Sequence, residues 1–368
     1  MKRINLFLIL LALASCAWAQ TKARYTERLD SIVVYEYWMP SFENLTTYKN
    51  YLKSEFSYNA KGQVEQILYY KRWEDGEGGW FLTNKREYFY DEQGRDTLRV
   101  VFLRADGQWE LSQKRYSTYD NHGEKLQERT VTYAKGEMLT ESRWDCIYNE
   151  GGKQVSASKY WRRVRTMPEE WQQTMAVHDE YDAKGNHVKE VYEYLNVPSA
   201  AKGTTIMRYD EAGRLTAEID SSYNVLLGGR EWRRKDFSYV GRQLSVMKDV
   251  VTTIDHDMVH QRMDESLFDP QGNLLQRRCY RQIHGELQHT SSESFFYDLN
   301  QEGSSIMGYE FVPEILGLVS KSMGFEEQGI FHHKLMMTSQ FWHLDEEEDD
   351  EEEDMKAETR LYYTILEK

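Results

Sequence analysis

The densest group of potential metal ligands in the chain is the stretch Asp255-His256-Asp257-Met258-Val259-His260. Imidazole and carboxylate groups are common ligands of transition metals. In an extended strand, His256 and His260 would share a face but lie about 13 Å apart, too far for one ion. His260 and His289 each stand eight residues before a recurring aromatic residue and could be neighbours in adjacent repeats. We favour ordinary polar strand residues at these positions and predict no metal site and no cofactor.

The sequence gives little support for an enzymatic function. The chain has no Gly-x-Ser-x-Gly elbow, no His-Glu-x-x-His and no phosphate-binding loop. We therefore predict no catalytic residues and regard a hydrolase site in the C-terminal segment as the least favoured hypothesis.

Three tryptophans are the candidate binding residues. Trp80, Trp109 and Trp171 recur at one position of a repeat. An aligned row of indole rings could stack on sugar rings or bind a protein through its apolar surface. The competing interpretation, which we favour, is that these rings cover the sheet near its turns.

These residues belong to a tandem repeat that fills most of the chain. Its marker is an aromatic residue, usually followed by Asp or Asn and then Gly, at Tyr58, Tyr90, Tyr119, Tyr148, Tyr181, Tyr209, Tyr239, Phe268 and Tyr297. Successive gaps are 32, 29, 29, 33, 28, 30, 29 and 29 residues. One structural unit is therefore copied along the chain.

Each period contains two turns. In Tyr90-Asp91-Glu92-Gln93-Gly94, Asp can accept a backbone hydrogen bond and Gly tolerates a positive φ. A second, looser turn lies about midway, as at Ala105-Asp106-Gly107, Ala134-Lys135-Gly136, Ile283-His284-Gly285 and Glu74-Asp75-Gly76. The pattern predicts an all-β fold of antiparallel hairpins of about 30 residues.

The strand faces favour a single sheet. Counting back from Tyr90 in steps of two gives Asn84, Leu82 and Trp80 on one face, apolar near the strand end and polar at its centre. The other face, Phe81 to Phe89, carries Lys85 and Glu87, which disfavours a transmembrane barrel. Neither face suits a two-sheet sandwich. We predict an extended, curled single-layer sheet or β-shell with both faces partly hydrated.

The segment Tyr88-Phe89-Tyr90-Asp91-Glu92-Gln93-Gly94-Arg95 resembles the signature of Rhs-type YD-repeat proteins, which are secreted or surface proteins with β-shells. Tyr209-Asp210-Glu211-Ala212-Gly213-Arg214 matches it in part. The resemblance covers about two thirds of the chain, but the period here is longer than is typical of that family. It implies an extracellular β-repeat scaffold.

The N-terminus predicts export. Lys2 and Arg3 precede the apolar run Ile4 to Ala14, and Ala17-Trp18-Ala19 is a small-x-small cleavage site, so residues 1–19 read as a signal peptide. Leu13-Ala14-Ser15-Cys16 also resembles a lipobox, which would place a lipid anchor on Cys16. Both routes stay open, with soluble export slightly favoured. The expected location is the periplasm, the outer-membrane surface or the exterior.

Residues 20–304 form the predicted repeat domain, and residues 305–368 a capping segment with an acidic loop at 345–354. Without residues 1–19 the formal charge is −17, of which ten negatives lie in that loop. A basic nucleic-acid footprint is absent. The loop could bind calcium weakly, but a solvated, self-repelling loop is favoured.

Two cysteines remain after signal removal, Cys146 and Cys279. They are 133 residues apart, and we predict two isolated thiols. The main functional hypothesis is a secreted or cell-surface β-repeat scaffold that binds a glycan or protein partner. The alternative is a purely structural component of the cell envelope.

Overall fold

The computed structural model describes residues 25–41, 44–73, 79–164, 166, 170–195, 201–224, 229–255, 258–315, 332–342 and 355–366. The signal peptide, Cys16, the acidic loop and the turn at Glu74 lie outside these ranges. No described helix is both long and apolar enough to cross a bilayer. The strands are β1 (Glu27–Ser41), β2 (Asn44–Tyr58), β3 (Val64–Trp73), β4 (Phe81–Tyr90), β5 (Asp96–Ala105), β6 (Gln108–Tyr119), β7 (Lys125–Ala134), β8 (Glu137–Tyr148), β9 (Gln154–Arg163), β10 (Gln172–Tyr181), β11 (His187–Tyr194), β12 (Ala201–Tyr209), β13 (Leu215–Asn224), β14 (Gly229–Val240), β15 (Gln243–Asp255), β16 (Met258–Phe268), β17 (Leu274–Ile283), β18 (Glu286–Glu302), β19 (Ile306–Met307), β20 (His333–Trp342) and β21 (Met355–Ile365).

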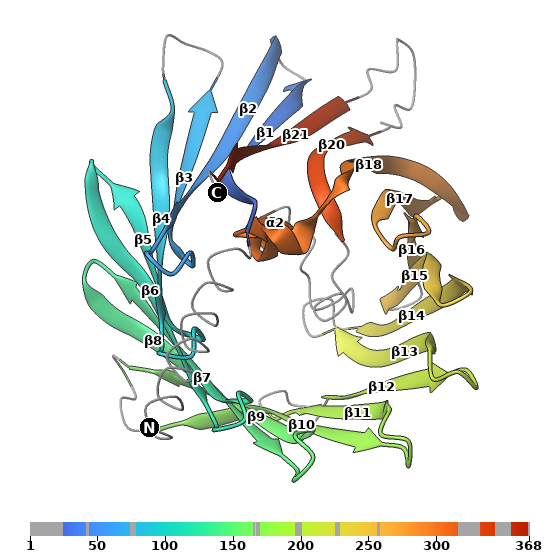
Figure 1. The fold of residues 1–368 in the computed structure, drawn as a ribbon. Helices are drawn as coiled ribbons and strands as arrows, with labels where there is room; N and C mark the ends of the chain where they lie inside the picture. Colours follow the sequence, from blue (N-terminus) through green and yellow to red (C-terminus); the bar gives the residue numbers. More distant parts are fainter. Residues whose placement is uncertain are drawn as a thin grey trace, which may run out of the picture.

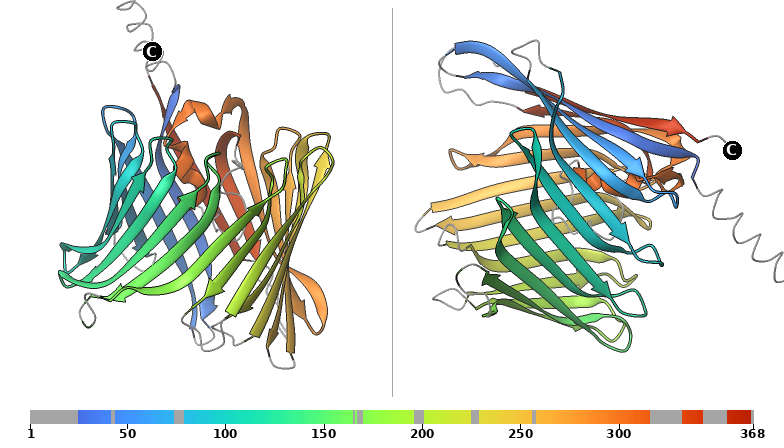
Figure 2. Two further views of the ribbon diagram at one scale, coloured as in Figure 1. Left: turned by 90° about the horizontal axis from the view of Figure 1, so that it is seen from below. Right: turned by 90° about the vertical axis from the view of Figure 1, so that its left-hand side faces the viewer.

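The strands form one closed barrel of 20 antiparallel strands (Figure 1). From β1 to β18 each strand pairs with the next, β18 pairs with β20, and β20 pairs with β21. The ring closes where β21 pairs with β1, with Glu27 opposite Ile365 and Glu36 opposite Ala357. The two-residue strand β19 adds to the start of β1 in parallel. The two further views in Figure 2 show the strands tilted along the wall.

The expectation of an extended, curled single-layer sheet is therefore wrong, because the first and last strands meet. An open sheet would expose the unpaired backbone groups of β1 and β21, and closure satisfies them. The repeat specifies hairpins of the expected size, but local turn chemistry carries no information about whether the two ends of the sheet pair. The predicted division at residues 304 and 305 stays a prediction.

The Tyr-Asp-Gly turns confirm the first predicted turn. At Asp91 the Gly94 N–H donates to the Asp91 carbonyl (3.1 Å), and the Arg95 N–H donates to Asp91 Oδ1 (2.9 Å). Gly94 has φ +84°, a left-handed conformation that glycine adopts at little cost. Asn59, Asp120, Asn149, Asp182, Asp210 and Asp269 accept equivalent bonds.

The repeated tyrosines serve a further purpose that the sequence alone did not show. Each hydroxyl donates to a backbone carbonyl at the start of an earlier strand, 2.5–3.1 Å away. We call these bonds the tyrosine ladder. Its donor and acceptor pairs are Tyr58 and Leu29, Tyr90 and Val64, Tyr119 and Asp96, Tyr148 and Lys125, Tyr181 and Gln154, Tyr209 and His187, Tyr239 and Leu215, Tyr297 and Leu274, and Tyr363 and Leu335. Tyr363 extends the ladder beyond the last predicted repeat.

The second predicted turn is also confirmed at three described hairpins. Asp106-Gly107, Lys135-Gly136 and His284-Gly285 each have two successive positive φ values, near +50° and then between +78° and +87°. Two such residues define a two-residue loop whose twist matches that of the flanking strands. The long hairpins therefore end in tight turns at the opposite rim from the tyrosine ladder.

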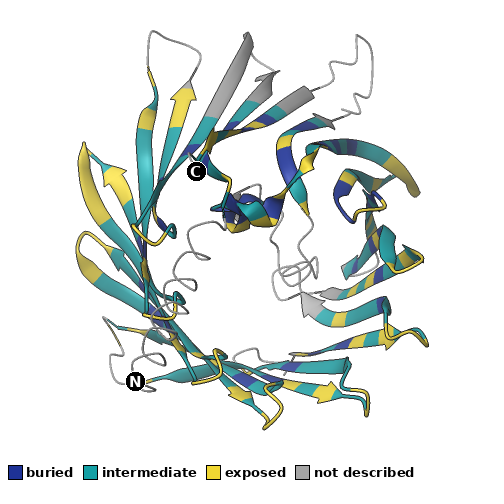
Figure 3. Ribbon diagram, in the orientation of Figure 1, coloured by how far each residue is buried: buried dark blue, intermediate teal, exposed yellow. Residues whose placement is uncertain are grey.

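A short segment inside the ring identifies the inner face. Turn η1 (Gly303–Ser305), β19, turn η2 (Tyr309–Phe311) and helix α2 (Val312–Ile315) follow β18, and α2 lies within the barrel (Figure 1). Phe311 packs edge-on against Tyr88 of β4, with ring centroids 5.2 Å apart. Val312 and Tyr309 pack with Leu29, Met247 and Phe295 from the wall. Figure 3 shows the buried residues gathered around this segment, which we call the plug.

Cross-strand partners share a face of a sheet, so the inner face can be followed from Tyr88 around the wall. From Tyr88 the pairs pass through Arg99 and Arg115 to the face of β8 that carries Cys146, which pairs with Ala157, and then to Val177 and Tyr192. Through β12 and β13 they continue to Lys235, Asp249, Asp264 and Cys279. Cys279 pairs with Ser291, which shares a face of β18 with Phe295, and Phe295 contacts the plug from the other side. The assignment is therefore consistent from β4 to β18.

Both described cysteines are free thiols, as predicted. Cys146 lies on β8 and Cys279 on β17, on well-separated parts of the wall. Burial raises the pKa of each thiol. Closure of the sheet therefore does not depend on a disulfide between them.

Candidate functional site

The three candidate tryptophans lie on the outer wall, towards the rim away from the tyrosine ladder. Each belongs to a hairpin that contains a β-bulge, as between Val101 and Phe102. Because a bulge inserts one extra residue, it reverses which side chains point outward. Trp80, just before β4, consequently faces outward while Asn84 of β4 faces inward. The predicted face that combined Trp80 with Asn84 is therefore wrong.

Each tryptophan packs against a cation that is also covered by a second ring. Lys85 Nζ lies 5.2 Å from the Trp109 ring centroid and 4.4 Å from that of Phe102. Such contacts stabilise by about 0.5–1 kcal/mol at exposed sites. In the same way, Lys53 lies between the rings of Tyr70 and Trp80, and Arg143 lies between the rings of Tyr160 and Trp171. Lys85 and Arg143 also pair with the carboxylates of Glu87 and Asp145.

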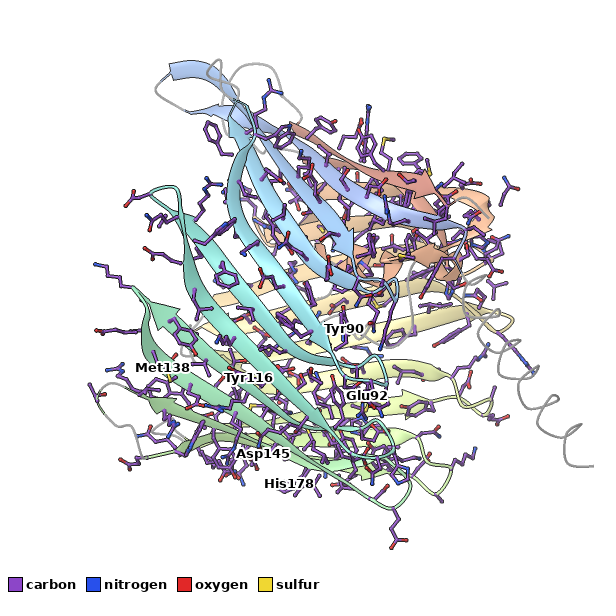
Figure 4. The ribbon with its side chains drawn as sticks, turned by 60° about the vertical axis from the view of Figure 1, so that its left-hand side comes forward. Tyr90, Glu92, Tyr116, Met138, Asp145 and His178 are labelled. Atoms are coloured by element: carbon purple, nitrogen blue, oxygen red, sulfur yellow. The ribbon has the colours of Figure 1, made fainter. Side chains whose placement is uncertain are left out.

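These contacts support the interpretation that the three tryptophans cover the sheet near its turns, because part of each indole surface already contacts the protein. Trp109 is still 37% exposed. Binding of a glycan or protein by Trp80, Trp109 and Trp171 stays a prediction. Figure 4 looks onto the outer wall, where Tyr116, Asp145 and His178 are labelled, with Met138 towards the far rim from Tyr90 and Glu92.

The two candidate histidines do not meet. His260 pairs with Thr253 on the inner face, whereas a bulge after Cys279 places His289 on the outer face opposite Tyr280. The His289 ring packs against the Tyr280 ring with the centroids 5.3 Å apart and the ring planes tilted by 58°. His256 lies outside the described residues. In the part of the chain that the structure describes, no group of three or more His, Cys, Asp or Glu residues could hold a metal ion.

The inner wall contains a candidate site that the sequence did not indicate. A cavity of about 520 Å³ opens on the inner face of β10 to β14. We call it the lumenal basin; its lining includes His187, Glu190, Tyr194, Glu218, Asp220 and Lys235. A second cavity of about 620 Å³ lies at the first two Tyr turns and is lined by turn residues and strand ends. The basin is the better candidate because charged and aromatic side chains converge on it.

A close backbone approach organises the basin. The Tyr192 ring lies over Gly203 of the neighbouring strand, where an added Cβ would come within 2.0 Å of the ring. The ring therefore requires glycine at this position. So placed, the Tyr192 hydroxyl donates to Asp220 Oδ2 (2.7 Å), and the Thr205 hydroxyl donates to the same oxygen (2.8 Å). Tyr194 packs edge-on against Tyr192 at 5.8 Å.

The basic groups of the basin are held by carboxylates. Lys235 Nζ contacts Glu218 at 2.5 Å, and the Lys235 side chain is 2% exposed. Arg233 contacts Asp249 in the wall, and its side chain is 14% exposed. His187 Nε2 lies 2.9 Å from Asp179. The hydrogen bond to Asp179 raises the pKa of His187.

The acidic groups of the basin outnumber its basic groups, because Glu190, Glu218, Asp220 and Glu231 line it with Arg233 and Lys235. Glu190, Asp220 and Glu231 are all partly exposed. Burial raises the pKa of Glu190, and the charges of Asp179 and Asp220 raise it further. With these carboxylates ionised, the formal charge of the basin lining is therefore negative. One sequence signal could have pointed here, because an isolated glycine in a strand often marks a close approach, and Gly203 is such a residue.

No protein-family model matches the chain, and no curated protein matches it. Among solved structures, a porin-like protein from Bacteroides uniformis ATCC 8492 aligns with 66% of this chain and 96% of its own, at 10% identity and a TM-score of 0.35. TcdB2-TccC3 without its hypervariable C-terminal region aligns with 72% of this chain at 9% identity and a TM-score of 0.25. This chain covers 18% of that second structure. Both are distant structural likenesses, and membership of the YD-repeat family is not shown.

Proposed function

We propose that the protein is an exported structural barrel of the cell envelope whose wall is hydrated on both sides. The observation that carries this proposal is the charge of the outer face at mid-strand. Cationic side chains occur there on two separate parts of the ring, β4 to β8 and β14 to β15, at Lys85, Lys114, Arg129, Arg143, Arg234 and Lys248.

The magnitude argues against a bilayer around this wall. A lipid-facing Lys or Arg at the bilayer midplane costs about 2–4 kcal/mol. Six such residues would cost roughly 12–24 kcal/mol before any allowance for ion pairing. Pairs such as Arg234 with Asp236 (2.8 Å) and Lys189 with Glu180 (2.7 Å) would also bring carboxylates into the lipid. Water on the outer wall removes this cost.

Membrane fractionation tests the proposal. The full chain is produced in a bacterial host that processes both kinds of signal, alongside the variant Cys16→Ser, which cannot be lipidated. We expect alkaline carbonate to release the Cys16→Ser variant and the released protein to stay monodisperse without detergent. A Cys16→Ser variant that resists carbonate and requires detergent would show that the wall itself sits in lipid.

Binding through the outer tryptophans is the second candidate function. The exposure of Trp109 supports it, since part of the indole ring stays accessible to solvent although Lys85 lies over it. Glycan-array and pull-down screens of the exported protein would be repeated with Trp80, Trp109 and Trp171 changed to Ala. Specific binding that survives all three changes would show that these tryptophans are not the binding site.

A further inference from the structure

The lumenal basin presents negative charge to the space it encloses. Of its charged lining residues, Lys235 and Arg233 are nearly buried and each contacts a carboxylate. The same lining holds four carboxylates, Glu190, Glu218, Asp220 and Glu231. A ligand in the cavity would therefore meet an excess of acceptor oxygens over cations.

Asp220 is the most firmly positioned of these acceptors. Two neutral hydroxyl groups, from Tyr192 and Thr205, donate to its Oδ2. These bonds fix the direction of the carboxylate without neutralising its charge. Since Tyr192 reaches Asp220 only because Gly203 lacks a side chain, the geometry is built into two neighbouring strands.

The uncharged lining suits the same kind of ligand. Tyr194 offers an aromatic ring, and Met175 and Met207 offer polarisable thioethers. Aromatic rings attract cations through their faces, and methionine adapts to irregular aliphatic groups. The combination of an excess of carboxylates with aromatic and methionine surface fits a positively charged aliphatic group better than an anion.

We propose that the lumenal basin binds a small aliphatic organic cation, with Asp220 and Glu190 as its anionic contacts and Tyr194 beside its carbon chain. The cavity of about 520 Å³ is large enough for a short diamine. This site is independent of the proposed structural function, because a barrel in lipid or in water would present the same inner wall.

The experiment uses the exported full-length protein and two probes of equal chain length. Isothermal titration calorimetry is run at low ionic strength with 1,4-butanediamine and with 1,4-butanediol, which replaces both ammonium groups by hydroxyls. We expect saturable binding of the diamine and no measurable binding of the diol. Equal binding of the two probes, or no binding of the diamine, would overturn the proposal.

Isosteric variants locate the binding. Asp220→Asn and Glu190→Gln each remove one charge while keeping an oxygen acceptor, and we expect each to weaken diamine binding at least tenfold. Glu180→Gln is the matched control, because Glu180 lies on the outer face of β10 with its side chain 57% exposed, and it should leave binding unchanged. If all three variants bind like the original protein, or the control weakens binding equally, the cation is bound elsewhere.

The pH dependence gives an independent readout. The groups around Glu190 are Asp179, His187, Glu218 and Asp220, with Glu231, Arg233 and Lys235 farther along the basin. Protonation of Glu190 or of His187 makes the basin less negative, so both effects weaken diamine binding as pH falls from 8 to 5. In Glu190→Gln this dependence should be smaller. A diamine affinity that rises as pH falls would contradict the assignment.

Discussion

Replacing Tyr297 by Phe removes one hydroxyl from the tyrosine ladder and tests whether the ladder stabilises the barrel. The Tyr297 hydroxyl donates to the Leu274 carbonyl at 2.8 Å, and Leu274 is 2% exposed. A typical hydrogen bond contributes about 0.5–1.5 kcal/mol, and leaving a buried polar group without its partner costs about 1–3 kcal/mol. Because the acceptor residue is buried, we expect Tyr297→Phe to lower the free energy of unfolding by about 1–3 kcal/mol.

Tyr209→Phe is the matched comparison, since its hydroxyl makes the same 2.8 Å bond to the carbonyl of the partly exposed His187. Water can replace the lost donor there, so the expected cost is about 0.5–1 kcal/mol. The measurement is the urea midpoint followed by tryptophan fluorescence and far-UV circular dichroism, with an unchanged slope showing that the same surface unfolds. If Tyr209→Phe destabilises the protein as much as Tyr297→Phe, burial does not govern the ladder and the reasoning fails.

Three further substitutions probe the basin and the wall. Burial and neighbouring carboxylates raise the pKa of Glu190 above its ordinary value. Folding therefore favours the protonated form, and stability is lost as pH rises through the folded-state pKa. Urea midpoints should fall less between pH 5 and pH 8 in Glu190→Gln than in the original protein. Gly203→Ala should displace the Tyr192 ring, because the added Cβ would lie within 2.0 Å of it. We expect the Tm to drop by several degrees and diamine binding to be lost. Unchanged diamine binding would refute the close approach. Glu141→Gln removes the charge of a fully buried outer-wall carboxylate that contacts two arginines, and should cost about 1.5–3 kcal/mol. Glu180→Gln, in the exposed pair with Lys189, should cost only about 0.2–1 kcal/mol, and equal urea midpoints for the two variants would contradict this ranking.

The hairpins could be predicted because their signals are local. Asp91 and Gly94 form the first turn within a few residues, and Asp106 with Gly107 forms the second. Neither depends on distant parts of the chain. The same locality explains why the turn motif alone suggested a β-shell and could not tell an open sheet from a closed one.

The faces of the strands were harder to predict, because one bulge in a hairpin reverses the alternation. Trp80 and Asn84 are four residues apart and would share a face in a regular strand. The register shift in that hairpin places them on opposite faces. Bulges depend on the partner strand as well as on the sequence of the bulged strand, so a count along one strand cannot find them.

The basin could not be predicted from spacing because its side chains come from five consecutive strands. Glu190, Asp220 and Lys235 are far from one another in sequence, and they converge only through the pairing of β11 to β14. The tandem repeat did not help, because a repeat predicts the same kind of residue at equivalent positions, whereas the basin depends on one residue that differs. That residue is Gly203, a glycine within a strand. Its effect is understood only when Tyr192 is known to lie opposite it.

Closure and plug docking are coupled at the seam between β1 and β21. One buried cluster contains Leu29 of β1, Leu335 of β20, Leu361 of β21, and Ile306 and Val312 of the plug. Leu29 comes from the start of the chain and the other four residues from its end, so β1 would lose these apolar contacts in an open sheet. Elsewhere most of the described wall residues are only partly buried, and the wall depends on backbone pairing, the tyrosine ladder and two smaller buried clusters. The largest buried cluster of the described residues reaches the seam, and its apolar contacts therefore favour closure of the repeating hairpin sheet into a barrel.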